Sequence, residues 1–279
     1  MREYEEFLSQ EVRSIKLHKM KYVGVLKLFD DLSLYNQLNV LDVGMGFGDM
    51  CKSIMDMCHY RVKSYQCIDM IDSQLKIAKK KLKRYPNVNI LKDDIVHTKL
   101  KGKYHIIICM DVMEHLTEME KEKAFANMNK LLIKGGYIIY STPLTEYLGK
   151  RLYYWNGVEG FEDRIQSDFW NVRGHIAVPS ITYNLSLFSR YKFKLIDLYY
   201  IKTCTPFDNN TLLNKLTFPI DLMTWFMPKA LSVYISPGII LLGQKKKELD
   251  DAWYTKDKYL DLFIPSRRKS MHLMKIGTK

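Results

Sequence analysis

The sequence predicts an α/β fold with a doubly wound, largely parallel sheet. Segments of strand and helix character alternate along the first half of the chain, and such alternation implies parallel strands joined by right-handed crossovers. Residues 106–109 are continuously apolar (Ile-Ile-Ile-Cys), as expected for a strand that is buried on both faces. Residues 40–48 join a buried strand to a glycine-rich turn and a helix start, an arrangement that holds nucleotide-like ligands in doubly wound folds.

The expected elements alternate in order along the chain. Apolar runs predict strands at residues 38–43, 62–68, 88–92, 104–110 and 137–140. Helical periodicity and capping residues predict helices at residues 3–34, from the glycine turn to about 58, at 72–84 and at 118–132. Pro86 and Asn87 should break the third of these helices, and Gly135-Gly136 should end the fourth. A helix at 179–189 and strands at 192–202 and 238–244 should complete the pattern.

We expect one domain that spans the whole chain, because 279 residues with 47% hydrophobic content suffice for one large core with a cap. The segment 147–170 is rich in Tyr, Trp and Phe interleaved with charges, which favours an insertion that caps the substrate. The expected parts of residues 1–279 besides the sheet are an N-terminal helical region (1–36), insertions over the sheet (143–178 and 204–236) and a C-terminal extension (246–279).

A short apolar segment at residues 215–229 contains Trp225 and Phe226 between Lys215 and Lys229. Such a segment suits a membrane interface or a lipid-linked substrate. It suits equally a cover over the substrate pocket or a contact between two copies of the chain. The sequence leaves these three roles open.

The chain is basic, with 43 Lys and Arg against 31 Asp and Glu and a formal net charge of +12. A basic surface favours anionic partners such as phosphate-bearing lipids, sugar nucleotides or nucleic acid, although a solvated lysine-rich surface explains the same charge. The five cysteines form no C-x-x-C pair, so we expect reduced thiols in a cytoplasmic protein. We find neither a secretory signal nor an uncharged apolar run of 18 residues, so any membrane contact should be peripheral.

The glycine turn has the pattern G-x-G-x-G at Gly44, Gly46 and Gly48. The dinucleotide fingerprint G-x-G-x-x-G would need a glycine at position 49, where Asp49 stands instead. Asp42 precedes the first glycine by two residues, and an acid there suits a ligand with positive charge. S-adenosylmethionine is such a ligand, because it has both an ammonium and a sulfonium group.

Four further motifs follow in order: Asp69-Met70, residues 92–95 (KDDI), residues 111–116 (DVMEHL) and residues 131–143 (LLIKGGYIIYSTP). With the glycine turn, they make the chain resemble the class I S-adenosylmethionine-dependent methyltransferases over residues 38–245. Within that class the chain resembles the group of ubiquinone-pathway O-methyltransferases and glycan and small-molecule methyltransferases. The resemblance implies a Rossmann-like sheet of seven strands in the order 3-2-1-4-5-7-6, with the last strand antiparallel.

The resemblance also implies the residues that bind the donor. Asp69 would accept both ribose hydroxyls, since a carboxylate has two acceptor oxygens. Met70 and Ile95 would sandwich the adenine ring, and Asp94 would accept from its amino group. The full expected set is Asp42, Gly44, Met45, Gly46, Phe47, Gly48, Asp69, Met70, Asp94, Ile95 and Met110.

Ordinary structural roles stay open for several of these residues. Asp69 could cap a helix, and Asp94 could cap its own loop. Asp93, the residue before Asp94, could be the one that takes the adenine contact instead. Met70 and Ile95 could be plain core residues, and Asp42 a structural acid of the turn.

Methyl transfer to a hydroxyl requires that the acceptor lose a proton, which calls for a base or a metal. The candidates are Glu114, His115 and His175, which match an acid-x-x-Glu-His…His pattern. In the similar small-RNA 2′-O-methyltransferases this set binds a divalent metal, so Asp111, Glu114, His115 and His175 are candidate ligands. Asp111 stands where those enzymes usually have a glutamate, and purely structural histidines remain an alternative.

We therefore expect S-adenosylmethionine-dependent methylation of a hydroxyl on a small molecule, a glycan or a lipid-linked precursor. The first alternative is an RNA 2′-O-methyltransferase, which the histidine pattern and the basic charge favour. The second is a non-catalytic scaffold that keeps the fold and binds a partner through residues 204–236.

Overall fold

The computed structural model describes residues 25, 26, 29, 37–146, 177–201, 231, 234 and 238–246. Its strands are β1 (Leu38–Val43), β2 (Val62–Asp69), β3 (Val88–Lys92), β4 (Tyr104–Met110), β5 (Leu132–Pro143), β6 (Phe193–Ile201) and β7 (Gly238–Lys245). Its helices are α3 (Asp49–Cys58), α4 (Asp72–Leu82), α5 (Glu118–Leu131) and α9 (Ile181–Arg190), with single 3-10 turns η2 (His59–Arg61) and η3 (Met113–His115). Every strand and helix predicted within these residues is present.

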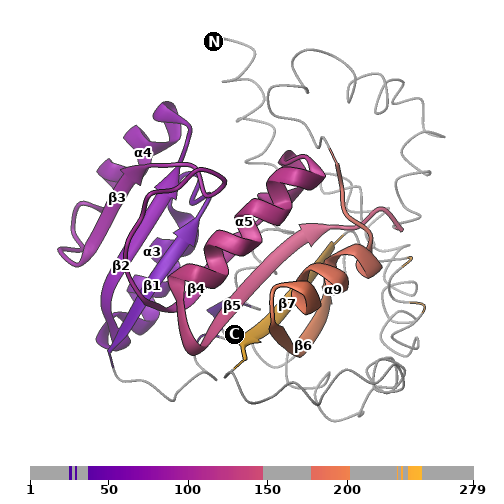
Figure 1. The fold of residues 1–279 in the computed structure, drawn as a ribbon. Coiled ribbons are helices and arrows are strands. Elements are labelled where there is room, and N and C mark those ends of the chain that lie inside the picture. Colours follow the sequence, from indigo (N-terminus) through magenta and orange to yellow (C-terminus); the bar gives the residue numbers. More distant parts are fainter. Residues whose placement is uncertain are drawn as a thin grey trace, which may run out of the picture.

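The seven strands form one sheet in the order β3-β2-β1-β4-β5-β7-β6 (Figure 1), which confirms the expected topology. Neighbouring strands from β3 to β5 are parallel, whereas β7 runs antiparallel to both β5 and β6. Parallel strands end at a common edge, so the segments that follow β1 to β5 lie along the same side of the molecule. The predicted donor and catalytic motifs are on these segments.

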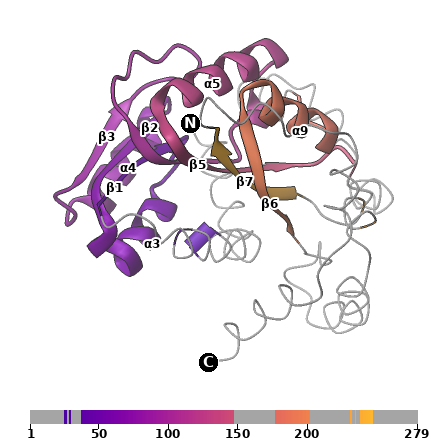
Figure 2. The same cartoon turned by 60° about the horizontal axis from the view of Figure 1, so that its bottom comes forward.

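Helices cover both faces of the sheet. Helices α5 and α9 lie on one face and α3 on the other (Figure 2). The strands supply both cores by alternation: Ile106 and Ile108 of β4 pack in the cluster with α3 and α4, while Ile107 and Cys109 pack in the cluster with α5 and α9. This double burial explains the continuous apolar run of β4.

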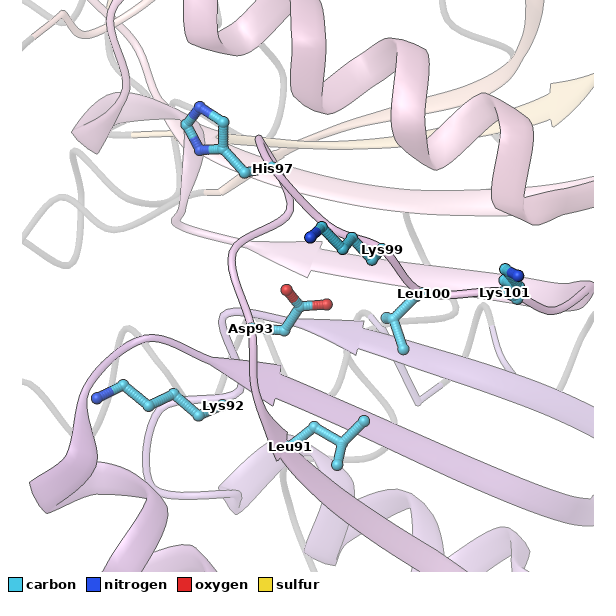
Figure 3. Close-up of a pocket in the computed structure, with 7 residues that line it drawn as sticks. All are labelled: Leu91, Lys92, Asp93, His97, Lys99, Leu100 and Lys101. Atoms are coloured by element: carbon cyan, nitrogen blue, oxygen red, sulfur yellow. The ribbon is translucent and has the colours of Figure 1, made fainter.

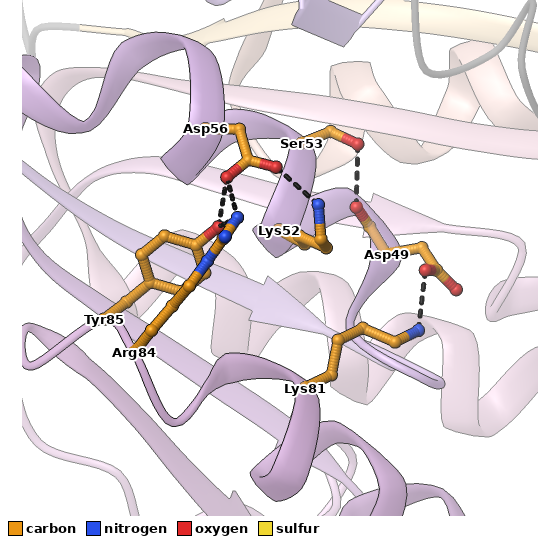
Figure 4. A network of polar contacts seen from close by, with 7 residues as sticks. All are labelled: Asp49, Lys52, Ser53, Asp56, Lys81, Arg84 and Tyr85. Atoms are coloured by element: carbon orange, nitrogen blue, oxygen red, sulfur yellow. Dashed lines mark hydrogen bonds and ion pairs between the residues drawn. The ribbon is translucent and has the colours of Figure 1, made fainter.

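Polar side chains link α3 to α4 and to Arg84 and Tyr85, which follow α4 (Figure 4). Lys81 pairs with Asp49 at 2.6 Å, and Asp56 accepts hydrogen bonds from Lys52 (2.5 Å), Arg84 and Tyr85. The hydrogen bonds from Lys52 and Tyr85 lower the pKa of Asp56 to about 2. These pairs are solvent-exposed, so they orient the two helices rather than contribute much stability.

The start of β5 differs from the prediction. We expected Gly135-Gly136 to end the preceding helix, but α5 ends at Leu131 and β5 begins at Leu132. Tyr104 pairs with Leu132 while Ile106 pairs with Tyr137, so β5 contains extra residues relative to β4. Gly135 takes a positive φ of 80°, which is the conformation that a glycine bulge requires.

Several predicted segments lie outside the described residues: most of 1–36, the greater part of the insertions 143–178 and 204–236, and the extension from 247 to 279. Cys51, Cys58, Cys67 and Cys109 are buried thiols. Among the helices of the described residues, none is long and apolar enough to cross a membrane.

Candidate active site at the glycine turn and the end of β4

The glycine turn between β1 and α3 closes against the end of β2. The amides of Gly44 and Met45 both donate to the carbonyl of Ile68, at 2.9 and 3.2 Å. Gly44, Gly46 and Gly48 have positive φ values of 66°, 56° and 76°, a conformation that residues with a Cβ rarely adopt. The turn therefore depends on glycine at all three positions.

The three glycines face different surroundings. A Cβ at Gly44 would lie 2.3 Å from Val112 Cγ2, and one at Gly48 would lie 2.8 Å from Leu82 Cδ1. A Cβ at Gly46 would meet no described atom within 4 Å. Gly44 and Gly48 thus permit close packing, whereas Gly46 borders open space in which a ligand can touch bare backbone.

Asp69 joins the end of β2 to this turn. Its Oδ2 accepts from the amide of Gly46 and its Oδ1 from the amide of Ile71, both at 2.9 Å. The side chain is only 7% exposed, and this burial raises the pKa of Asp69 although the two amides oppose the shift. Each carboxylate oxygen can accept a second hydrogen bond, so Asp69 can hold the turn and a ligand's hydroxyls together.

Asp42 is 2% exposed and lies on the strand that leads into the turn. Its Oδ2 accepts a hydrogen bond of 3.1 Å from the hydroxyl of Tyr65, which is itself fully buried on β2. Burial raises the pKa of Asp42 to about 7, although the Tyr65 hydroxyl lowers it in part. A buried acid that titrates near neutrality is typical of functional sites.

The residues expected around the adenine ring have mixed surroundings. Met70 is 58% exposed and could be covered by a ligand, while Ile95 is 4% exposed and packs in the core with α5. Asp94 caps its own loop, since Oδ1 accepts from the amide of Val96 and Oδ2 contacts His97 Nδ1 at 2.7 Å. The loop-capping role left open for Asp94 is therefore present, and any contact with adenine would be additional.

A surface hollow of about 550 Å³ lies beside β3 (Figure 3). Three of its lining residues are lysines, and the full lining consists of Leu91, Lys92, Asp93, His97, Lys99, Leu100 and Lys101. Because His97 also contacts Asp94, the hollow borders the expected adenine end of the donor site rather than the turn after β4.

The turn after β4 carries the predicted catalytic residues and is anchored to the end of β5. Asp111 has a positive φ of 53°, and its Oδ1 accepts from Ser141 Oγ at 3.1 Å. Glu114 is 1% exposed, and its Oε2 accepts from Thr142 Oγ1 at 3.4 Å. Successive strand residues point to opposite faces, so Ser141 and Thr142 hold Asp111 and Glu114 on opposite sides of β5.

Ala177 is fixed between this turn and α5. Its amide donates to the carbonyl of Glu114 at 3.2 Å, and its carbonyl accepts from Lys121 Nζ. Lys121 is only 1% exposed, and burial lowers the pKa of its ammonium group. His175 lies outside the described residues, two positions before Ala177.

The described candidate ligands, Asp111, Glu114 and His115, do not come together as a metal site. Within the part of the chain that the structure describes, no group of three His, Cys, Asp or Glu side chains is arranged to hold an ion. The attachment of Asp111 and Glu114 to opposite faces of β5 gives a physical reason.

Four residues that shape the site were not predicted as site residues from the sequence: Tyr65, Lys121, Ser141 and Thr142. A signal for Lys121 was available, because it is spaced by 3, 4 and 7 residues from the buried Ala124, Phe125 and Met128 of α5. A lysine on the apolar face of a helix needs a buried partner. Tyr65, Ser141 and Thr142 gave no comparable signal.

Comparisons with known proteins agree with this geometry. Residues 40–136 match the family model described as "Methyltransferase domain", which spans the glycine turn, Asp69, Asp94 and the Asp111–His115 turn. Among curated proteins, none matches the sequence.

Solved structures that are similar to this chain include methyltransferases. The N-methyltransferase NodS from Bradyrhizobium japonicum WM9, in complex with S-adenosyl-L-homocysteine, is 12% identical with a TM-score of 0.56 over 83% of this chain and 89% of that chain. Magnesium protoporphyrin IX methyltransferase (ChlM) from Synechocystis PCC 6803 with bound SAH is 15% identical, with a TM-score of 0.56 over 82% of this chain and 84% of that chain. The methyltransferase domain of bacterial-CtHen1-C is 15% identical, with a TM-score of 0.54 over 83% of this chain and 100% of that chain. At such identities the similarity establishes the fold.

Proposed function

We propose that this chain, a class I S-adenosylmethionine-dependent methyltransferase by its domain and its fold, methylates a hydroxyl group. The acceptor would be a small molecule, a glycan or a lipid-linked precursor. The observation that carries the proposal is the contact between the glycine turn and the Glu114–His115 turn: Gly44 leaves no room for a Cβ because Val112 packs against it. The residues expected to bind the donor therefore lie beside the candidate base.

The donor fits the cradle at Gly46. The open space there matches a ligand that lies against the backbone, and Asp69 offers acceptors for the ribose hydroxyls. Asp42 supplies negative charge near the cationic methionine end, and Met70 offers an exposed apolar surface to the adenine ring. When bound, S-adenosylmethionine supplies an electrophilic methyl group.

The chain's own residues would align the acceptor and remove its proton. His115 would accept the hydroxyl proton on a ring nitrogen, and Glu114, buried beside it and held by Thr142, would fix the backbone of the turn. Alignment and the exclusion of water supply the remaining rate enhancement. His175 remains the second candidate base, because the segment that follows it is fixed to Glu114 through Ala177.

The test is transfer of a labelled methyl group from S-adenosylmethionine to a panel of sugars, lipid-linked sugars, phenols and matched amines. We expect labelled ethers with hydroxyl acceptors and a loss of about 100-fold or more in kcat for His115→Gln or for His175→Gln. Label that appears only on amines would contradict the hydroxyl assignment. Calorimetric titration with S-adenosylmethionine separates an enzyme from a scaffold, because a scaffold need not bind the donor.

A second candidate function is methylation of an RNA 2′-hydroxyl. The basic hollow beside β3, with Lys92, Lys99 and Lys101, favours it, because phosphate contacts come mainly from such side chains. RNA binding that weakens steeply with added salt would support this candidate, and no binding at low salt would exclude it.

Residues 215–229 lie outside the described residues, so the peripheral membrane contact remains part of the proposal, as does a cytoplasmic location. Binding to anionic vesicles by the intact chain, lost when Trp225 and Phe226 are replaced by serine, would support the membrane contact. Binding that survives these replacements would assign the contact to another segment.

A further inference from the structure

The pair Asp42–Tyr65 is unusual for its burial. Both side chains lie on the α3 face of the sheet, in an apolar cluster that includes Val40, Cys51 and Cys67. Asp42 is paired in register with Cys67 on β2, and Tyr65 precedes Cys67 by two residues, on the same face. Among the described residues, the Tyr65 hydroxyl is the one side-chain group that donates a hydrogen bond to Asp42.

An ionised carboxylate in such surroundings needs a hydrogen-bond donor, because burial penalises its charged form. Two titratable groups of the described residues act on the pKa of Asp42, namely Tyr65 and Asp69, both from β2. Asp42 in turn raises the pKa of Cys67 on β2 and of Cys109 on β4, while Cys51 of α3 acts on Tyr65 and Cys67. Burial raises the pKa of both Cys67 and Cys109, so these thiols stay neutral near pH 7. The Asp69 charge raises the pKa of Asp42, whereas the Tyr65 hydroxyl lowers it.

We propose that Tyr65 is a positioning residue for donor binding: its hydroxyl holds the Asp42 carboxylate in the orientation and ionised form that attract the cationic methionine end of S-adenosylmethionine. This inference rests on the proposed function, because it takes that donor as the ligand. It adds a residue on β2, beside the strand that leads into the glycine turn, and it makes donor affinity depend on pH near neutrality.

The direction of the pH effect follows from linkage. A cation beside Asp42 is bound more tightly when Asp42 is ionised, so donor affinity should rise with pH and level off above the pKa of about 7. Removal of the Tyr65 hydroxyl should raise that pKa further, because the hydroxyl favours the ionised form. The rise in affinity should therefore move to higher pH.

The experiment is calorimetric titration of S-adenosylmethionine into the wild-type chain and Tyr65→Phe between pH 5.5 and 9. We expect Tyr65→Phe to bind about tenfold more weakly at pH 7 and to approach wild-type affinity at pH 9. An equal loss at every pH, or no loss, would overturn the proposal, since a merely structural role would not shift the pH profile.

Tyr104→Phe is the matched control, because Tyr104 is a buried tyrosine on β4, at the end of that strand away from the glycine turn; its profile should equal that of the wild type. Asp42→Asn tests the titrating group without altering Tyr65: its profile should be flat, and a persisting pH dependence would overturn the proposal. A wild-type chain that binds no donor at any pH would instead contradict the proposed function.

Discussion

The carboxylate of Asp69 accepts a hydrogen bond from the backbone amide of Gly46 at 2.9 Å across a sequence separation of 23 residues. This bond ties the end of β2 to the tip of the glycine turn. The two elements that we expect to bind the ribose and the methionine end of the donor are thus fixed to each other before any ligand arrives. Such preorganisation lowers the entropic cost of binding.

Gly46→Asn should reduce donor affinity by about tenfold or more while the fold persists. Asparagine tolerates a positive φ better than most residues, and its side chain would enter the open space that we assign to the donor. Calorimetry gives the affinity, and urea denaturation should give a loss of about 1 kcal/mol in the free energy of unfolding. Gly102→Ala is the control for backbone strain away from the turn, since Gly102 also has a positive φ (151°) while a Cβ there would make only ordinary contacts with Tyr104. Unchanged donor affinity in Gly46→Asn would place the donor elsewhere.

Asp69→Asn should weaken donor binding by roughly 10- to 100-fold, because an amide group replaces one of the two acceptor oxygens and charge-assisted hydrogen bonds are lost. The free energy of unfolding should also fall by about 1 kcal/mol, because asparagine has one acceptor oxygen and cannot accept from the amides of both Gly46 and Ile71. Asp72→Asn serves as the control: Asp72 is exposed and pairs with Lys92. Equal donor affinities for Asp69→Asn and Asp72→Asn would remove Asp69 from the site.

Asp42→Asn should change how stability depends on pH in the absence of ligand. The pKa of Asp42 is about 7 in the folded chain, whereas its ordinary value is 3.8. The stabilisation that protonated Asp42 gives to the folded state is therefore fully present below about pH 4 and is lost as pH rises through 7. Relative to Asp42→Asn, the wild type should lose up to about 4 kcal/mol of unfolding free energy between these limits. Urea denaturation across pH 4–8 measures the difference. A difference that does not vary with pH would show that Asp42 is not buried as described.

Lys121→Met should lower kcat while donor affinity stays close to that of the wild type. Methionine keeps the apolar stem of the side chain but cannot donate to the carbonyl of Ala177, so the segment that reaches Glu114 should be held less firmly. Methyl-transfer kinetics should show a decrease of about tenfold in kcat, in line with the loss of one hydrogen bond from a charged donor. Lys123→Met, on the exposed side of α5, should behave like the wild type. An equal decrease in both variants would point to a general effect on the helix.

Much of the fold was predictable because it depends on local patterns. Within the described residues, the predicted ends of most helices and strands agree with the structure to within two positions, since apolar runs and capping residues mark them. Thr117, for example, caps α5 through a reciprocal pair with Glu120. The strand order came from the resemblance to a known family rather than from spacing.

The remaining features depend on contacts between distant residues. The early start of β5 reflects a register shift against β4, which no local pattern in residues 131–137 reveals. The hydrogen bond from Tyr65 to Asp42 joins β2 to β1, and the one from Ser141 to Asp111 joins β5 to the turn after β4. The sequence identified the acids as site candidates, but it could not identify the hydroxyl groups that hold them.

The position of β7 has a consequence for synthesis on the ribosome. Within the part of the chain that the structure describes, β6 is joined to the sheet only through β7. Strand β7 follows β6 by some 37 residues (201 to 238), so β6 should not enter the sheet until β7 has left the exit tunnel. The end of β5 that carries Ser141 and Thr142 pairs with the first residues of that same late strand. The nascent chain should therefore complete the donor-binding half first and acquire the support for its catalytic turn among the last steps of folding.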